Sequence, residues 1–164
     1  MLLEKYNFDL FADYFQFYLQ DEQADLDLSL NIWSEQAVED LLAVTPDIIH
    51  IGTVRNMTVP VAVEVHDSEP NEDFNLWEHI TECSIEIPSG SLVVAGCSDY
   101  FPDAARIKII PDTYRARIFY GALETLSEDG LDGDDHYKVT LWLGEAVKPQ
   151  VIKQRVKERT VNAG

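Results

Sequence analysis

Two segments of the chain alternate strictly between apolar and polar side chains, at residues 113–120 and 136–143. Their apolar faces consist of Tyr114, Ala116, Ile118 and Tyr120 in the first segment and of Tyr137, Val139, Leu141 and Leu143 in the second. A period of two residues in β-branched and aromatic side chains is typical of half-buried antiparallel strands. The pattern therefore predicts two such strands, with the carboxylate-rich residues 127–135 in the hairpin loop between them.

Shorter apolar segments predict the remaining strands. We expect them at residues 10–20, 47–54, 57–66, 77–87, 92–97 and 105–110. The segments 47–54 and 57–66 are predicted to pair, and Pro60 indicates a sheet edge for the second one because proline cannot donate a ladder hydrogen bond. Eight or nine short strands at regular spacing favour a mainly β fold, an antiparallel β-sandwich, over alternating βαβ units.

One short helix is predicted near residues 34–43. Ser34 is a suitable N-cap, and Glu35 lies in the first turn, where the helix dipole favours a carboxylate. Pro46 restricts the residue before it and so is expected to end the helix.

The last segment, residues 147–164, differs from the rest because it is basic. Val151, Ile152 and Val156 stand near helical spacing, which predicts an appended helix; a tail folded back on the acidic body and a solvated extension are the alternatives. The expected organisation is one β-sandwich domain over residues 1–146 followed by a basic C-terminal extension over residues 147–164.

Length and cysteine content narrow the class of protein. A chain of 164 residues fits one domain with a proper core. No run of 18 apolar residues is present, and the first residues do not show the pattern of a secretory signal, so we expect no membrane span. Cys83 and Cys97 are too few for a disulfide framework, which favours buried free thiols and a cytoplasmic location.

Charge is the least ordinary property of the sequence. The net charge is −18, and residues 1–50 hold 11 acidic and 1 basic side chains, whereas residues 151–164 hold 1 and 4. Such a chain repels phosphate backbones, so we expect no direct nucleic-acid binding, and it attracts basic proteins. Solubility alone is the competing explanation of the charge.

The sequence offers little catalytic chemistry. Four histidines lie isolated from one another, and no zinc spacing, phosphate-binding loop or nucleophile elbow is present. The aspartates of residues 127–135 lack the glycine, the glutamate and the flanking helices of a calcium-binding EF-hand. We therefore expect a protein that is not an enzyme and needs no cofactor or metal.

Two groups of segments resemble a known family. The first comprises Tyr-Phe-Gln-Phe-Tyr at residues 14–18 and Trp-Ser-Glu-Gln-Ala-Val-Glu at residues 33–39. The second comprises residues 83–88, 107–110, 114–117 and 137–142. In this order and spacing the chain, over about residues 11 to 145, resembles the competence protein J family of nuclease inhibitors, within a broad group of bacterial β-sandwich proteins. The basic extension and the longer acidic loop at 127–135 depart from that family.

The resemblance implies an inhibitor or immunity-like partner of a basic nuclease, which would present carboxylates where substrate phosphates lie. The candidate contacts are Asp21, Glu22, Asp25 and Asp27; Asp67, Glu69, Glu72 and Asp73; and Glu128, Asp129, Asp132, Asp134 and Asp135. Affinity also needs a desolvated anchor, for which the candidates are Trp33, Trp77 and Trp142. Each of them is more often a core residue, and the pattern favours the core for Trp142, because Arg117 on an adjacent strand can stack on it.

Two further functions stay open at this point. A sandwich that binds a sugar or another small molecule would need a pocket with Trp or Tyr rings beside carboxylates. A scaffolding protein would use residues 57–66 as an open edge that accepts another strand, and homo-oligomers would follow from it.

Overall fold

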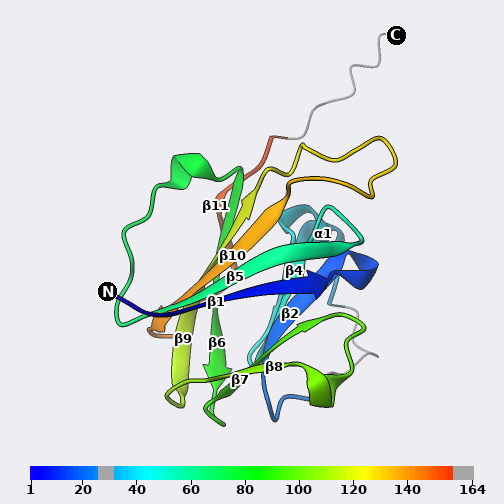
Figure 1. The fold of residues 1–164 in the computed structure, drawn as a ribbon. Coiled ribbons are helices and arrows are strands. Elements are labelled where there is room, and N and C mark those ends of the chain that lie inside the picture. The colour runs from blue at the N-terminus through cyan, green and yellow to red at the C-terminus, as the bar shows by residue number, and fades with distance from the viewer. Residues whose placement is uncertain (26–31, 157–164) are drawn as a thin grey trace.

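The computed structural model describes residues 1–25 and 32–156, which form two sheets (Figure 1). The first sheet has six strands in the order β1 (Leu2–Phe11), β5 (Thr58–His66), β10 (His136–Leu143), β9 (Asp112–Gly121), β6 (His79–Ile87) and β11 (Gln150–Lys153). The second has five strands in the order β3 (Leu42–Thr45), β4 (Ile48–Gly52), β2 (Gln16–Asp21), β7 (Ser91–Gly96) and β8 (Ala105–Lys108).

Helical structure is limited to short segments. These are the α-helix α1 (Glu35–Asp40) and the 3-10 turns η1 (Asp13–Phe15), η2 (Phe74–Leu76) and η3 (Phe101–Asp103). Over the described ranges, no helix has the length and hydrophobicity needed to cross a membrane.

The two sheets share one hydrophobic core. Phe17 and Leu19 of β2 and Ile49 of β4 belong to the same cluster of buried side chains as Val63 of β5 and Ile118 of β9. Burial of these faces is the main favourable term in folding, at about 25 cal/mol per Å² of apolar surface. The two sheets therefore pack face to face.

The strand pair predicted from alternation is confirmed. β9 and β10 pair antiparallel with Ile118 opposite Val139, and the predicted apolar faces are buried except for Leu143, which is 43% exposed. The rest of the fold class is corrected in two respects. The described residues form eleven strands, and the first sheet is mixed, because β10 runs parallel to β5.

The predicted first strand at residues 10–20 is wrong, because the chain changes sheets in the middle of it. β1 ends at Phe11, and β2 begins at Gln16. Between them Tyr14 and Phe15 have φ angles of 57° and 60°, in the left-handed region that β conformation cannot accommodate. The aromatic run thus serves as a corner between two strands.

The predicted helix is confirmed in place but is shorter than 34–43. The Ser34 hydroxyl accepts a hydrogen bond from the Ala37 N–H at 3.1 Å, as expected of an N-cap. Leu41 stops the helix because it adopts φ 58°, and the residues after it form strand β3, not a last helical turn.

The predicted pairing of residues 47–54 with 57–66 is wrong, since β4 and β5 belong to different sheets. β5 is also an inner strand, so Pro60 does not mark an edge. The N–H of Ala12 bonds to the Met57 carbonyl, so these two residues form a hydrogen-bonded pair of the β1–β5 ladder. Hydrogen-bonded and non-hydrogen-bonded pairs alternate along the ladder, and the Asp9–Pro60 pair is therefore non-hydrogen-bonded, with the Pro60 nitrogen directed away from β1. On the other side the pairing with β10 begins only at Val61, so the missing N–H of Pro60 costs no ladder bond.

The basic extension does not form a helix over residues 147–156. Gln150–Lys153 is instead strand β11, which pairs antiparallel with β6 at the edge of the first sheet. The β-branched Val151 and Ile152 favour this conformation. The extension is thus attached to the sheet through residues 150–153.

Candidate functional site

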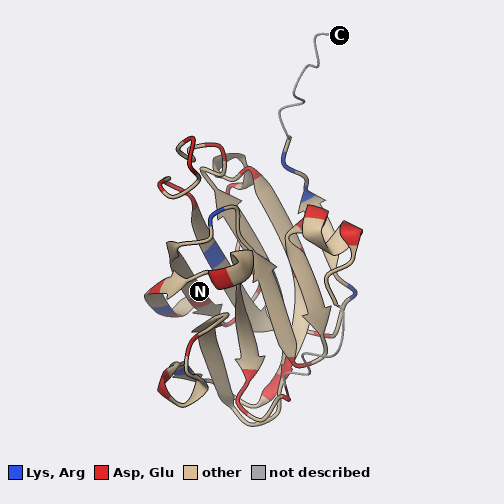
Figure 2. Ribbon diagram, turned by 90° about the vertical axis from the view of Figure 1, so that its right-hand side faces the viewer, with Lys and Arg blue, Asp and Glu red and all other residues tan. Residues whose placement is uncertain are grey.

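Acidic residues gather mainly on loops and short helical turns of the molecule (Figure 2). The three clusters predicted as contacts have different environments. Whether a carboxylate can contact a partner depends on whether a group of its own chain already binds it, so each cluster is considered in turn.

The first cluster, around residues 21–25, is mostly structural. Asp21 is buried and accepts hydrogen bonds from the Ser89 N–H and hydroxyl at 3.0 and 2.6 Å. Glu22 pairs with Arg106 at 3.0 Å, and hydrogen bonds from Ser91 and Arg106 lower the pKa of its carboxyl group. Asp25 is exposed, and Asp27 lies outside the described residues.

The second cluster lies on a segment, residues 67–78, that crosses the outer face of the first sheet and is here called the strap. Glu69 binds Arg117 at 2.7 Å, and Glu72 binds Lys138 at 2.8 Å. Asp67 binds the amino group of Met1 at 2.6 Å. Asp73 caps turn η2 by accepting the Asn75 N–H at 2.9 Å. Glu69 and Glu72 therefore fasten the strap to the sheet.

Beneath the strap lies a layer of buried charge. Arg117, 6% exposed, binds Glu82 at 2.9 Å as well as Glu69, and Arg115 binds the other oxygen of Glu82 at 2.7 Å. Trp142 is 5% exposed, and the Arg117 guanidinium lies 4.9 Å from the centroid of its ring. Trp142 is therefore a core residue with the stacking that the alternation of β9 and β10 suggested, and its ring is not an exposed anchor.

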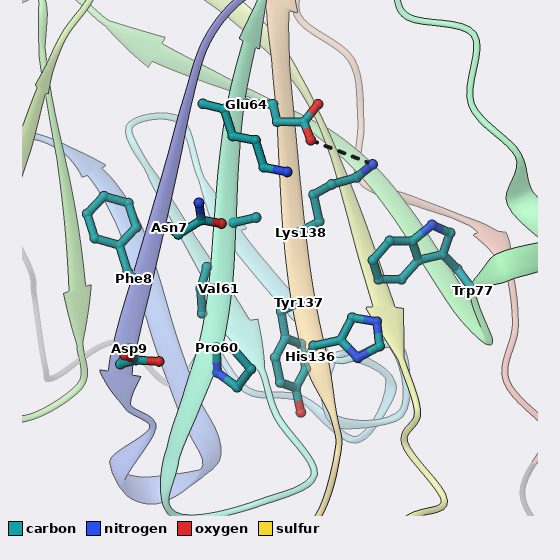
Figure 3. Close-up of a pocket in the computed structure, with 12 residues that line it drawn as sticks. Asn7, Phe8, Asp9, Pro60, Val61, Glu64, Trp77, His136, Tyr137 and Lys138 are labelled. Carbon is teal, nitrogen blue, oxygen red and sulfur yellow. Dashed lines mark ion pairs between the residues drawn. The ribbon is translucent and has the colours of Figure 1, made fainter.

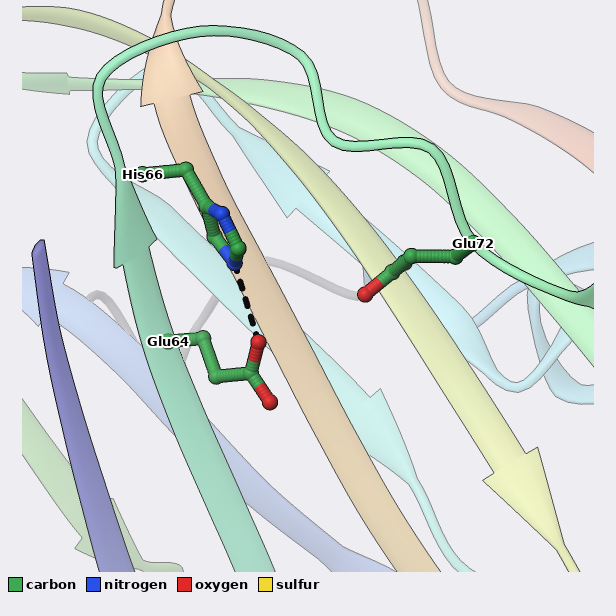
Figure 4. A group of neighbouring side chains, drawn as sticks. All are labelled: Glu64, His66 and Glu72. Atoms are coloured by element: carbon green, nitrogen blue, oxygen red, sulfur yellow. Dashed lines mark hydrogen bonds and ion pairs between the residues drawn. The ribbon is translucent and has the colours of Figure 1, made fainter. Parts of the chain in front are cut away.

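A His and two carboxylates approach one another beside this layer (Figure 4). Candidate ligand atoms of Glu64, His66 and Glu72 lie within 4.8 Å of one another, and His66 Nε2 is 2.9 Å from Glu64 Oε1. The Lys138 ammonium is 2.8 Å from Glu72 Oε1 and 3.9 Å from Glu64 Oε2. It supplies a positive charge where a metal ion would do so, and the group is an internal ion-pair network.

The third cluster lies on residues 122–135, here called the acidic loop. Asp135 is buried at its base, with Arg55 at 2.8 Å and the Tyr137 hydroxyl donating at 2.8 Å. Asp129 shapes the turn, because its carboxylate accepts the Ser127 hydroxyl and the Leu131 N–H; these bonds lower the pKa of Asp129. The remaining carboxylates are exposed and have no ion pair within the described part of the chain: Glu124, Glu128, Asp132 and Asp134.

Next to this loop is an apolar groove of about 480 Å³, here called the aromatic groove. Tyr14 and Phe15 line it with side chains 74% and 52% exposed, and Trp33 and Val38 complete the apolar surface. The sequence pattern does not identify Tyr14 and Phe15 as groove residues, because their alternation with Phe17 predicts a strand. The available signal was their place between two strands that the chain cannot join without a turn.

The aromatic groove and the acidic loop are linked through the connection between β4 and β5. Thr53 and Val54 line the groove, and Thr53 N–H bonds to the Phe15 carbonyl at 2.8 Å. The next residue, Arg55, holds Asp135 at the base of the acidic loop. The aromatic groove is thus connected through residues 53–55 to the base of the acidic loop, a combination of apolar and acidic surface that suits recognition of a protein with both apolar and basic groups.

A second concavity, the outer groove, lies on the outer face of β1, β5 and β10 (Figure 3). Its volume is about 440 Å³, and Trp77, Lys138 and Glu64 line one part of it. Lys138 Nζ lies 5.4 Å from the Trp77 ring centroid, and His136 packs on Trp77 at 5.1 Å. The groove therefore places an aromatic ring beside charged groups.

Buried titratable groups fit a structural role. Burial lowers the pKa of His50 to about 4 and raises the pKa of Cys83, so both are held neutral at pH 7. Burial is also the largest cause that lowers the pKa of His79, whose Nε2 bonds to the Asp40 carbonyl at 2.7 Å. Both cysteines are free thiols, Cys83 buried and Cys97 partly so.

These features define a mainly β protein of two packed sheets with an acidic, aromatic-lined end. No protein-family model and no curated protein matches the sequence. Among solved structures, the chain is similar to ComJ from Bacillus subtilis, inhibitor of the DNA degrading activity of NucA, with a TM-score of 0.64 and 13% identity over 88% of this chain and 98% of that one.

A second similar structure is described as crocagin biosynthetic gene J, with a TM-score of 0.62 and 17% identity over 87% of this chain and 98% of that one. At these identities the likeness concerns the fold. It supports the expectation that the chain has a competence protein J-like fold.

Proposed function

We propose that this protein is a non-enzymatic inhibitor that binds a basic nuclease through the acidic loop and the aromatic groove. The observation that carries the proposal is an acidic loop with four exposed carboxylates that lack internal ion pairs, whose base is linked through Arg55 to the connection that lines an exposed aromatic groove. The likeness of the fold to a nuclease inhibitor supports it. The free thiols are consistent with action in the cytoplasm, which belongs to the same proposal.

The two parts of the surface have separate tasks in this proposal. A nuclease holds substrate phosphates in a cationic groove, and the loop carboxylates would occupy the same positions. Their charge steers the encounter with the nuclease, which raises the association rate constant from ~10⁶ towards ~10⁸ M⁻¹s⁻¹ at low salt. Rim charges add little affinity, so Tyr14 and Phe15 supply the desolvated anchor.

A DNA-degradation assay tests the proposal. Basic nucleases of the host are purified and mixed with equimolar protein, and association is measured at low and high salt. We expect inhibition, and slower association as salt rises. The proposal fails if no basic nuclease is inhibited or if salt leaves association unchanged.

Matched variants separate a specific surface from general acidity. Replacing Glu128, Asp132 and Asp134 with lysine should weaken binding at least tenfold. The control is the lysine variant of three exposed carboxylates elsewhere: Glu86, Asp103 and Glu145. Both variants change the net charge equally, so equal losses would show that only net charge matters.

The anchor is tested in the same way. Phe15→Ala should weaken binding at least tenfold without lowering the melting temperature, because the ring is half exposed. Tyr100→Ala is the control, since Tyr100 is 71% exposed but does not line the aromatic groove. Equal binding by Phe15→Ala and the wild type would exclude the groove as the anchor.

The outer groove favours a second candidate function, the binding of a sugar or another small polar molecule. Trp77 can stack on a sugar ring, and Glu64 and Asp9 offer acceptors for its hydroxyl groups. Quenching or a shift of tryptophan fluorescence on titration with a panel of saccharides would support it. A ligand response that persists in Trp77→Phe would place the binding elsewhere.

A further inference from the structure

Strand β1 leaves one side of its backbone unpaired. It is one of the two edge strands of the first sheet and pairs with β5 alone. The Ala12–Met57 bond shows that even-numbered residues of β1 direct their backbone groups to β5. Residues 5, 7 and 9 therefore direct N–H and C=O to the open side, where they are available to another strand.

The open edge ends at Phe11. A Cβ atom at Gly96 would lie 2.3 Å from the Phe11 carbonyl oxygen, so β7 covers the strand there. The available edge is thus centred on Asn7, with two residues on each side as far as Lys5 and Asp9.

The side chains along this edge are complementary to themselves in the antiparallel direction. When two copies of β1 are placed about Asn7, Lys5 of one lies opposite Asp9 of the other, and Tyr6 lies opposite Phe8. Lys5 is the single basic side chain of the first 50 residues. Cross-strand pairs of opposite charge and of aromatic rings stabilise antiparallel strands.

Other registers lose these matches. A shift of the centre by one residue places Lys5 opposite Asn7 or opposite Phe11, and Asp9 then faces Leu3 or Asn7. The outward backbone groups of residues 5, 7 and 9 can pair in each of these three registers, because odd-numbered residues face odd-numbered residues in all of them. The side-chain matches therefore select the Asn7-centred alignment.

We propose that a second copy of this chain pairs with β1, antiparallel and centred on Asn7. The two copies are related by a two-fold axis, so the contact is the same on both, and their first sheets join into one continuous sheet. This inference does not depend on the proposed function, because β1 contributes no residue to the acidic loop or the aromatic groove.

Salt should act on this contact in the opposite direction from nuclease binding. Each copy carries a net charge of −18, and the general repulsion opposes association. Added salt screens that repulsion, whereas the Lys5–Asp9 pairs lie in contact and are screened less. The dimer should therefore become stronger as salt rises.

Sedimentation velocity on the full chain, over a series of protein concentrations, tests the proposal. We expect a monomer–dimer equilibrium whose dissociation constant falls as salt rises. Asn7→Pro should abolish the dimer, since it removes the central outward N–H, and should leave the thermal unfolding nearly unchanged. Asn7→Ala is the control and should retain it. A wild-type monomer under all conditions, or a dimer that persists in Asn7→Pro, overturns the proposal.

Charge exchange tests the register. Asp9→Lys and Lys5→Asp should each raise the dimer dissociation constant at least tenfold, although the first makes the net charge less negative and the second makes it more negative. A mixture of the two variants should form a heterodimer, because each lysine then faces an aspartate. If Asp9→Lys dimerises more tightly than the wild type, or if the mixture stays monomeric, the Asn7-centred pairing is wrong.

Discussion

The strap and the acidic loop are similarly rich in carboxylates and use them in opposite ways. Glu69 and Glu72 of the strap bind Arg117 and Lys138 on the sheet beneath, and Asp67 binds the N-terminal amine. In the acidic loop, only Asp135 has an ion pair among the described residues. Carboxylate density in a sequence therefore does not tell how much negative charge a partner can meet.

The difference has a physical origin in the strands that each segment covers. The outward face of β9 and β10 carries Arg115, Arg117 and Lys138, and these side chains require counter-charges once the strap excludes water. The acidic loop extends beyond the sheet and covers no such face. Its carboxylates stay hydrated and repel one another.

The largest predicted effect is the loss of Arg117. In Arg117→Met the buried Glu82 keeps one ion pair, with Arg115, and the hydrogen bond from Gln150, and the strap loses its link through Glu69. Breaking a buried pair costs ~3–5 kcal/mol, and we expect the lower end because Arg115 remains. Urea unfolding measures it. Glu22→Gln, which removes the charge of the partly exposed pair with Arg106, should lose much less; equal losses would remove the distinction between buried and exposed pairs.

Neutralising the same number of carboxylates in each segment tests the comparison directly. Replacing Glu69, Glu72 and Asp73 with their amides should lower the unfolding free energy by about 2 kcal/mol, because Lys138 keeps only its longer contact with Glu64 and Arg117 loses its pair with Glu69. The amide variant of Glu128, Asp132 and Asp134 should change it by less than about 0.5 kcal/mol, since no internal partner is lost. Chemical denaturation of both variants decides the point.

Lys138→Met should convert the ion-pair network into a cation site. Loss of the ammonium should destabilise the fold by about 1 kcal/mol and leave Glu64, His66 and Glu72 without a positive charge. Zinc should then raise the melting temperature of the variant and not that of the wild type. A calorimetric scan with and without zinc tests this, with Lys148→Met as control; an equal zinc effect on the wild type would contradict it.

The smallest effect concerns the pKa of Asp67. The hydrogen bond from the N-terminal amine lowers it, so this contribution to stability is present at neutral pH and is lost as the pH falls through the lowered pKa. Acetylation of Met1 should raise the Asp67 pKa towards its ordinary value. The pKa of Asp129, which the hydrogen bond from the Ser127 hydroxyl lowers, should not change on acetylation. A carboxyl NMR titration measures both.

Local patterns predicted what local forces determine. The alternation in residues 113–120 and 136–143 identified β9 and β10, and Ser34 located the start of α1. The stacking of Arg117 on Trp142 followed from the same alternation. In each case the decisive neighbours lie on adjacent strands or within one helical turn.

The remaining features depend on contacts between distant parts of the chain. Pro60 marked no edge, because the end of the β10 pairing leaves room for it. The use of the strap carboxylates is set by Arg117 and Lys138, which are 48 and 66 residues from Glu69 and Glu72. The aromatic groove needs Phe15 to follow a change of sheet, which alternation alone does not reveal.

The parallel contact between β5 and β10 has a consequence for how the molecule is made. β5 ends at His66, and its inner neighbour begins at His136, so this pairing closes a large loop and must overcome its entropy. During synthesis β5 leaves the ribosome well before β10, so its backbone groups on that side have no partner. The first sheet therefore cannot form completely until the final third of the chain has been synthesised, and folding should be slow. Chaperones that bind the exposed β5 should raise the yield of folded protein.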